Sequence, residues 1–548
     1  MIMKVAIVGD YTTKTLTKSL LDINPGLEIY EADFSQVDYE IINEGSKLYK
    51  FKPDVVVIHE TSVSFKNKYN SLNRPNSKYY EVSIFRLEKL VYKINSVFSD
   101  IKIIYPTLDI NNEMTFGNYF FKVPESVDAQ LHYYNYGLTQ LAIKISNLFL
   151  VDTNNLVFHN ADVRDSRLVV TADLHFTISF TKEIALAINK IINASMGKFI
   201  KCIILDLDNT LWGGVIGDDG LDGIQIGDLG IGKAFSEFQK WLKLLRKRGI
   251  ILCVCSKNNE KLAKEPFIKH SDMILSLDDI AIFVANWDNK VKNIQHIAKI
   301  LNIGYDSIIF IDDNPVERDM VKFAINTIIV PELPSDPTLY KDFLIKENFF
   351  EITNYSNLDK ERTKKYKAET ERKILESSSF NVDDYLKSLK MKAKFKKANG
   401  KIFPRISQLT QRTNQFNART VRYDESKVKS IANNKNYISF GYKLEDKFGD
   451  HGLVGLVILK KVNDLCLFID TICISCRVFN RGFEYFIINH LKEIMSNNGY
   501  QYLVVEWIPT EKNDIVRSFF SSLGFENFEN EEGKLHIDNI KINKYYID

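Results

Sequence analysis

Acidic side chains stand in pairs where apolar segments of the chain end. Asp206 and Asp208 follow the segment CIIL, and Asp312 and Asp313 follow the segment IIFI. Residues two apart on an extended chain project to the same side, and α/β sheets bind ligands at the carboxyl ends of their parallel strands. Gathering such charges requires a cation, and carboxylate oxygens are ligands of Mg²⁺. The pattern therefore predicts a magnesium site at a sheet edge.

Two further side chains between these pairs suit phosphate chemistry. Ser256 ends the apolar segment ILCVCS, and Lys290 closes the sequence NWDNK. Hydroxyl and ammonium groups suit the oxygens of a phosphoryl group and offset its charge during transfer. One acidic pair alone is explained as well by a solvated turn, but four such groups in order favour a phosphoryl-transfer site.

A parallel sheet is needed to bring these residues together, and the surrounding pattern predicts one. Within residues 197–345, strands begin at CIIL and recur at 251–256, 308–313 and 327–331, separated by helical stretches. This alternation is typical of a doubly wound α/β domain.

Two other parts of the chain differ in pattern from this central domain. Residues 1–196 show a separate α/β rhythm, whereas 385–548 combine β-like segments with amphipathic helices and predict an α+β domain. Between them and the centre, residues 346–384 carry opposite charges at helical spacing, which predicts an exposed linking helix. The strand-like segments of the first domain are 5–10, 55–59 and 103–106.

Composition excludes several classes of function. The 548 residues hold 72 basic and 70 acidic side chains, so no global field draws the protein to nucleic acid or to anionic lipid. No apolar run reaches the roughly 18 residues that a membrane span requires. Only 6 cysteines occur, without a disulfide framework. We therefore expect a cytoplasmic protein that contacts neither nucleic acid nor membrane.

In their order along the chain, the acidic pairs, Ser256 and Lys290 resemble the four motifs of the haloacid dehalogenase (HAD) superfamily of phosphoryl-transfer enzymes. The resemblance implies that Asp206 is the nucleophile and that Asp208 is the general acid and base. It also implies that Mg²⁺ is held by Asp206, by the main-chain carbonyl of Asp208 and by Asp312. The side chains that it assigns to the transferring phosphoryl group are Thr210, Ser256 and Lys290.

A second chemical group lies in the carboxyl-terminal domain. Cys476 ends a β-like segment, and the residues after it open a helix. The helix N-terminus together with Arg477 and Arg481 favours the thiolate, which attacks acyl carbons, and would welcome a phosphate of coenzyme A or phosphopantetheine. Packing as a small apolar side chain explains Cys476 equally well. Cys473 completes a Cys-x-x-Cys pair, which leaves zinc or redox chemistry as an alternative.

Longer segments resemble known families. Residues 513–525 and 477–484 resemble the closing motif and the pyrophosphate-binding turn of GNAT-type acyltransferases, although this chain lacks the turn's second glycine. Residues 206–220, 413–423 and 475–484 together resemble the FkbH-like family, whose members fuse a HAD domain of the IIIC class to a GNAT-like domain. The resemblance implies three domains, at 1–196, 197–345 and 385–548.

The FkbH-like resemblance also implies an activity. Family members remove phosphate from 1,3-bisphosphoglycerate and load the glyceryl unit onto the phosphopantetheine arm of an acyl carrier protein through a cysteine thioester. In this sequence, Cys476 occupies the position of that cysteine. Two rival functions remain open, a plain phosphatase of a small phosphorylated metabolite and a coenzyme A-dependent N-acyltransferase fused to a phosphatase.

Further candidate site residues accompany Cys476. His451 is placed to assist deprotonation of the thiol, although a structural histidine explains it as well. Polar groups in the segment TNQFN are candidates to orient the hydroxyls of a small acid, and an amide-rich turn is the alternative. These groups are Asn414, Gln415 and Asn417, preceded by Arg412.

The first domain resembles the SGNH-hydrolase-like unit that precedes many family members. Esterase chemistry needs a serine after the opening Gly-Asp, and this chain has Tyr11 there. We therefore expect a degenerate domain in which Asp173 and His175 are structural, and a docking surface for the carrier protein is a reasonable use for it.

Overall fold

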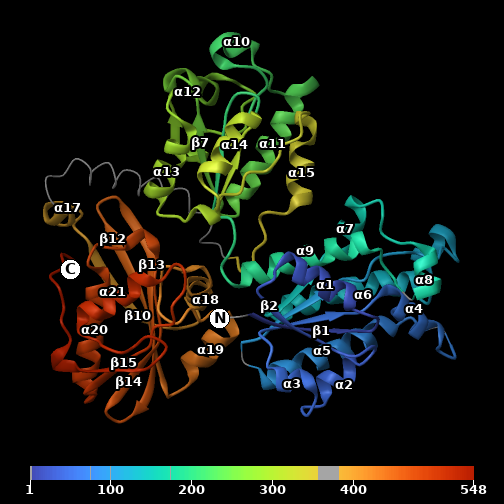
Figure 1. Ribbon diagram of the computed structural model, residues 1–548, viewed down its shortest axis with the longest axis horizontal. Helices are drawn as coiled ribbons and strands as arrows, with labels where there is room; N and C mark the ends of the chain where they lie inside the picture. The colour runs from blue at the N-terminus through green and yellow to red at the C-terminus, as the bar shows by residue number, and fades with distance from the viewer. Residues whose placement is uncertain (1–2, 75, 99, 173, 356–381) are drawn as a thin grey trace. The chain divides into compact units, whose positions relative to one another are not determined.

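The computed structural model describes residues 3–74, 76–98, 100–172, 174–355 and 382–548 (Figure 1). The chain divides into two compact units, Met1–Met196 and Gly197–Asp548. The second unit contains both the predicted HAD domain and the predicted GNAT-like domain. Most of the predicted charged linker, residues 356–381, lies outside the described residues.

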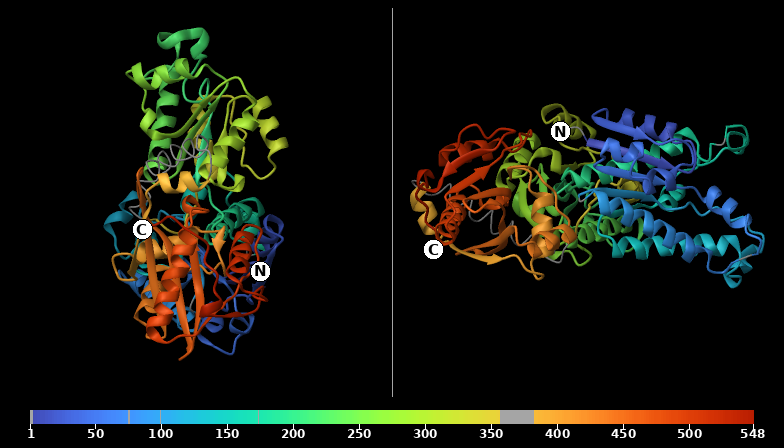
Figure 2. Two further views of the ribbon diagram at one scale, coloured as in Figure 1. Left: turned by 90° about the vertical axis from the view of Figure 1, so that its left-hand side faces the viewer. Right: turned by 90° about the horizontal axis from the view of Figure 1, so that it is seen from below.

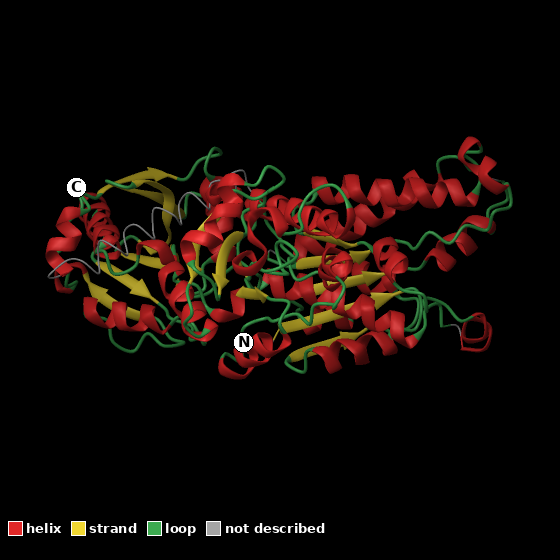
Figure 3. Ribbon diagram, turned by 90° about the horizontal axis from the view of Figure 1, so that it is seen from above, coloured by secondary structure: helices red, strands yellow, loops and turns green. Residues whose placement is uncertain are grey.

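The first unit is built on a five-stranded parallel sheet with the order β2-β1-β3-β4-β5. Helices α1 and α9 pack on one face, and α5 and α6 cover the other. Figure 3 shows helices in red on both sides of the yellow strands. The strands are β1 (Met3–Gly9), β2 (Leu27–Glu31), β3 (Val55–His59), β4 (Lys102–Pro106) and β5 (Leu148–Val151). The helices are α1 (Lys14–Ile23), α2 (Val37–Ile42), α3 (Lys47–Phe51), α4 (Ser62–Asn70), α5 (Tyr79–Val97), α6 (Val127–Lys144), α7 (Thr153–His159), α8 (Ser166–Ala172) and α9 (Ile178–Ser195).

In this unit, an aromatic pair fills the position where the SGNH resemblance requires a nucleophile. The order of strands reverses between β1 and β3, and such switch points are where parallel sheets bind ligands. There, the Tyr11 hydroxyl lies 2.9 Å from Nδ1 of His59, and both side chains are buried. Burial lowers the pKa of His59 to about 4, so the ring is neutral. His175 is also buried, and Asp173 lies outside the described residues.

The HAD module of the second unit has a parallel sheet with the order β8-β7-β6-β9. Helices α11 and α15 pack on one face, and α13 and α14 pack on the other. The strands are β6 (Cys202–Leu205), β7 (Ile251–Ser256), β8 (Ile280–Ala285) and β9 (Ile308–Ile311). The helices are α10 (Ile216–Gly223), α11 (Gly230–Lys247), α12 (Glu260–Lys269), α13 (Lys290–Leu301), α14 (Pro315–Ala324) and α15 (Tyr340–Glu347).

The strand predicted at 327–331 is wrong. This segment makes one isolated bridge, between Ile309 and Ile329. Pro331 has no N–H to extend a ladder, and the next residue, Glu332, pairs with Arg318 on α14. The fourth strand of the sheet is β8 instead, which the sequence pattern did not single out.

The GNAT-like module has a mixed sheet with the order β10-β12-β13-β14-β15-β16. Its strands are drawn in orange and red in Figure 2. Alternate residues of β13 face α20 and α21 on one side and α18 and α19 on the other. Its strands are β10 (Lys392–Lys397), β11 (Phe416–Asn417), β12 (Tyr437–Asp446), β13 (Gly449–Asn463), β14 (Cys466–Ile474), β15 (Tyr502–Val505) and β16 (Gly533–His536). Its helices are α17 (Val382–Ser388), α18 (Phe403–Arg412), α19 (Glu425–Asn433), α20 (Phe483–Asn498) and α21 (Asp514–Leu523).

Strand β14 has an unusual edge. It pairs in parallel with β15 only over Cys466–Phe468, and its far end pairs with the two-residue strand β11. Cys476 lies two residues beyond the end of β14. The motif TNQFN and the cysteine are therefore brought together by main-chain pairing between segments about sixty residues apart.

Among the described residues, no helix combines the length and the apolar character that crossing a bilayer requires. The cysteines are all free of disulfides, and Cys476 alone of them is not fully buried.

Candidate active site

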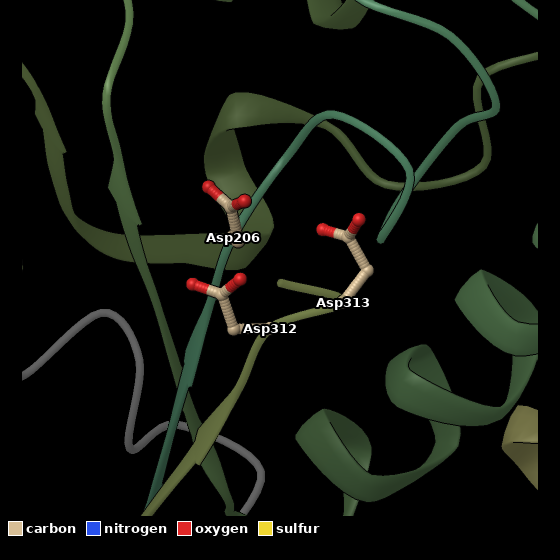
Figure 4. Close-up of side chains that lie close together, drawn as sticks. All are labelled: Asp206, Asp312 and Asp313. Carbon is tan, nitrogen blue, oxygen red and sulfur yellow. The ribbon is translucent and has the colours of Figure 1, made fainter. Parts of the chain in front are cut away.

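Three carboxylates meet at the switch point of the HAD sheet. In the order β8-β7-β6-β9, the chain adds β7 and β8 on one side of β6 and then returns to add β9 on the other side. This switch point leaves a crevice at the carboxyl ends of β6 and β9. Asp206 directly follows β6, and Asp312 and Asp313 directly follow β9. One oxygen from each carboxylate lies within 4.8 Å of the others. Figure 4 shows the three side chains close together.

Lys290 is the counter-charge of this cluster. It begins α13, and its Nζ lies 3.1 Å from Oδ2 of Asp206 and 2.6 Å from Oδ2 of Asp312. Burial lowers the pKa of this ammonium, but the charges of the two aspartates raise the pKa above its ordinary value. Lys290 therefore stays protonated and holds the ends of β6 and β9 together.

The cluster still carries excess negative charge. Burial and the charge of Asp206 raise the pKa of Asp313, and they raise the pKa of Asp312 to about 7. Oδ1 of Asp206 is buried and has no hydrogen-bond partner in the described part of the chain. Three carboxylates and one ammonium fit a divalent cation with oxygen ligands, and Mg²⁺ is such an ion. Sequence reasoning did not name Asp313 as a ligand, although its place beside Asp312 was the available signal.

Asp208 has its carboxylate outside the cluster. Its Oδ1 accepts hydrogen bonds from Trp212 Nε1 at 2.9 Å and from the main-chain N–H of Ile216 at 3.0 Å, and its Oδ2 accepts one from Asn258 at 2.9 Å. Burial raises the pKa of Asp208 above its ordinary value, which is the direction that a general acid requires. Asn258 was missed by sequence reasoning, and its signal was its place two residues after Ser256.

Thr210 and Arg318 fix the acidic loop that follows β9. The Thr210 hydroxyl lies 3.2 Å from the main-chain N–H of Asp313, which donates to it. Arg318 donates from Nη1 to the main-chain carbonyls of Asp312 and Asp313, at 2.9 and 2.7 Å. Both side chains are buried, so this loop is held from two sides. Ser256 ends β7 and is buried, and the phosphoryl-binding roles of Thr210 and Ser256 stay predictions.

Cys476 borders a second cavity, of about 350 Å³, which lies between the HAD and GNAT-like modules of the second unit. Asn302, which follows α13, donates from Nδ2 to the main-chain carbonyl of Cys476 at 2.7 Å. Basic side chains outnumber acidic ones around this cavity. The charged lining residues are Lys201, Arg405, Arg412, Arg477 and Lys512, with Asp306 and Glu511.

The nearby Cys473 differs from Cys476 in environment. It lies inside β14, and burial raises its pKa to about 12, so it stays a thiol. Over the ranges that the structure describes, the aspartate cluster is the only group with metal-ligand geometry. The zinc alternative for Cys473 and Cys476 therefore finds no support there.

The amide residues of TNQFN divide into two groups. Asn414 and Gln415 line the cavity at Cys476, and Asn414 also donates to the main-chain carbonyl of Gly197 at 3.1 Å. Asn417 is fully buried in β11, where its Oδ1 accepts from the N–H of Thr420 at 3.0 Å. Asn417 does not line the cavity, because its side chain is used to close its own turn.

His451 is buried away from the thiol. Its Nε2 lies 3.0 Å from Oδ2 of Asp446, and 2% and 0% of the two side chains are exposed. Nη1 of Arg481 lies 3.9 Å from the same carboxylate oxygen, and Arg481 lines an adjoining cavity that Cys476 also borders. His451 is not among the lining residues of either cavity, and the carboxylate that it contacts also lies near Arg481.

An acidic cluster with a buried lysine at the switch point of a parallel sheet defines a HAD-type phosphatase domain, and the comparisons agree. Residues 4–193 match the family described as FkbH, N-terminal domain. This chain is similar to the crystal structure of the N-terminal part of the protein BF1531 from Bacteroides fragilis, which contains a phosphatase domain complexed with Mg. The two sequences are 39% identical over a match that covers 64% of this chain and 94% of that chain, with a TM-score of 0.61. The chain therefore belongs to the FkbH-like family.

Acetyltransferase structures match a smaller part of the chain. The ribosomal-protein-S18-alanine N-acetyltransferase from Escherichia coli is 17% identical and covers 26% of this chain and 94% of its own, with a TM-score of 0.21. An N-acetyltransferase from Staphylococcus aureus is 16% identical and covers 26% of this chain and 96% of its own, with a TM-score of 0.20. No curated protein matches the chain in sequence.

Replacing Asp313 by Asn tests the metal assignment. We expect the Mg²⁺ concentration for half-maximal phosphatase activity to rise by about tenfold or more, because one anionic oxygen is lost from the cluster. Titration of activity with Mg²⁺ measures this, and Asp319→Asn, on the exposed side of α14, is the matched control. An unchanged Mg²⁺ requirement in Asp313→Asn would remove Asp313 from the metal site.

Replacing His451 by Gln tests whether this histidine acts as a base. Alkylation of Cys476 by iodoacetamide should keep its pH profile, because His451 lines neither cavity and the glutamine amide can still donate a hydrogen bond to Asp446. The matched control is His296→Gln on the exposed side of α13. If the pH dependence of the alkylation rate at low pH disappears only in His451→Gln, His451 is instead the base.

Proposed function

We propose that this protein moves the glyceryl unit of 1,3-bisphosphoglycerate to an acyl carrier protein through a thioester on Cys476, and removes the ester phosphate at Asp206. The HAD-type phosphatase domain accounts for cleavage of the phosphate ester. The other phosphate linkage of the donor is an acyl phosphate, which a thiolate attacks without a metal ion. The two modules of the second unit thus suit the two different phosphate linkages of one donor.

The observation that supports this proposal most directly is the basic cavity beside a partly exposed thiol. Cys476 is the one cysteine within reach of solvent in the described chain, and five basic side chains face two acidic ones around it. A donor that carries two phosphate groups is strongly anionic and would be attracted there. A cysteine packed only as a small apolar residue would not need such surroundings.

The acyl step is a substitution at carbon. The thiolate of Cys476 attacks the acyl carbon, the bond from that carbon to the phosphate oxygen breaks, and inorganic phosphate leaves with the electron pair. Arg477, which is buried at the cavity wall, is placed to offset the charge of the departing phosphate. The pantetheine thiol of the carrier then attacks the thioester and restores the thiolate of Cys476.

The ester phosphate is removed by the HAD residues. The Asp206 carboxylate attacks phosphorus while Asp208 gives a proton to the leaving alcohol oxygen. Water then attacks the aspartyl-phosphate while Asp208 takes a proton from that water, and phosphate leaves from Asp206. Lys290 offsets the charge of the phosphoryl oxygens. A magnesium ion held by Asp206, Asp312 and Asp313 supplies further charge neutralisation when bound.

Intact-protein mass spectrometry after mixing with 1,3-bisphosphoglycerate and Mg²⁺ tests the proposal. We expect a covalent glyceryl or phosphoglyceryl adduct on the wild-type chain and on the control Cys466→Ala, and at least a hundredfold less on Cys476→Ala. Adding an acyl carrier protein that bears phosphopantetheine should discharge the adduct. Equal acylation of the carrier by wild type and Cys476→Ala would refute the thioester on Cys476.

A further inference from the structure

The aspartate cluster and Cys476 lie at opposite ends of the same strands. Lys201, just before β6, and Ser307, just before β9, line the cavity of Cys476. Asp206 and Asp312 follow the other ends of those two strands. At about 3.3 Å per residue, the step from Ser307 to Asp312 covers about 17 Å.

Helix α13 gives an independent measure of the same separation. Its first residue, Lys290, contacts Asp206 and Asp312, whereas Asn302, just after its last residue, bonds to the main chain of Cys476. The helix has 12 residues, and its length is about 18 Å. Two elements of the HAD module thus place the two reaction centres on opposite edges of one sheet.

This separation exceeds the reach of a small acyl group. A three-carbon acyl chain that ends in a phosphate ester spans roughly five bonds of about 1.5 Å, and thus about 8 Å from sulfur to phosphorus. The packed sheet and α13 fill the space between the two sites, and packed interiors do not open for a passing group. A phosphate on an acyl group attached to Cys476 therefore does not reach Asp206.

We infer that the phosphatase site acts on a phosphate ester that is not attached to Cys476. Its substrate is a free phosphorylated acyl donor before acyl transfer, or a phosphoacyl group on the pantetheine arm of the carrier after transfer. Both share the same chemistry, a phosphate monoester on a short acid. This inference rests on the proposed function and adds the state in which the substrate is dephosphorylated.

Timed mass spectrometry of the full chain tests the inference. Wild type and Asp206→Asn are each mixed with one equivalent of 1,3-bisphosphoglycerate and Mg²⁺, without carrier, at two enzyme concentrations tenfold apart. The masses of the glyceryl and phosphoglyceryl adducts on Cys476 are followed with time. A carrier protein is added in a second series.

The inference predicts that a phosphoglyceryl adduct, once formed, keeps its phosphate equally long in wild type and Asp206→Asn. Under the free-donor route, wild type shows the glyceryl adduct from the earliest time, and Asp206→Asn shows only the phosphorylated one. Under the carrier route, both chains hold the phosphorylated adduct until the carrier is added, and phosphate is then lost only with wild type.

One result would overturn the inference. It is a phosphoglyceryl adduct of wild type that decays to the glyceryl adduct without carrier, at a rate independent of enzyme concentration and absent in Asp206→Asn. A lack of any adduct on both chains would refute cysteine acylation itself, and with it the proposed function.

Discussion

The pairing of one buried ammonium with two buried carboxylates is the constraint around which the HAD module is built. Lys290 holds Asp206 and Asp312 at the ends of neighbouring strands. Burying these charges costs several kcal/mol for each ion, and the cost is offset only by close pairing and further hydrogen bonds. Arg318 and Thr210 supply those bonds to the acidic loop. The remaining negative charge fits a divalent cation with oxygen ligands.

In the proposed reaction, the two chemistries lie at opposite edges of one sheet, and this separation has a physical advantage. Water must reach the aspartyl-phosphate at Asp206, because hydrolysis completes that reaction. Water at Cys476 would instead waste the acyl group by hydrolysing its thioester. One open cavity could not serve both needs, whereas two cavities joined by a rigid sheet and by α13 can. The contact between Asn302 and Cys476 shows that the HAD module also forms part of the second cavity.

Local sequence patterns predicted some of the strands, but they missed β8 (Ile280–Ala285) and predicted a strand at 327–331 that is not formed. Apolar segments ending in acidic residues predicted β6 and β9, whereas the position of Lys290 at the start of α13 is known from the structure alone. Long-range contacts had no local signal. Neither the pairing of β11 with β14 nor the contact of Asp446 with Arg481 leaves a periodic trace in the sequence. The apolar segment at 327–331 resembled a strand by pattern, but Pro331 and the pairing of Glu332 drew the chain away after one bridge.

The turn after Cys476 has Glu484 at the position where the GNAT pyrophosphate-binding turn has its second glycine, and this difference affects anion binding. Gly482 has a φ of +81°, and a Cβ there would lie 2.6 Å from Cβ of Tyr545, so this first glycine is required. Two residues later, where the GNAT turn has its second glycine, stands Glu484, which is buried in the first turn of α20. Burial raises the pKa of this carboxyl, while the main-chain N–H groups of Gly482 and Glu484 lower it by hydrogen bonding. The Glu484 carboxylate thus takes main-chain donors that a pyrophosphate would use, which disfavours coenzyme A at this helix.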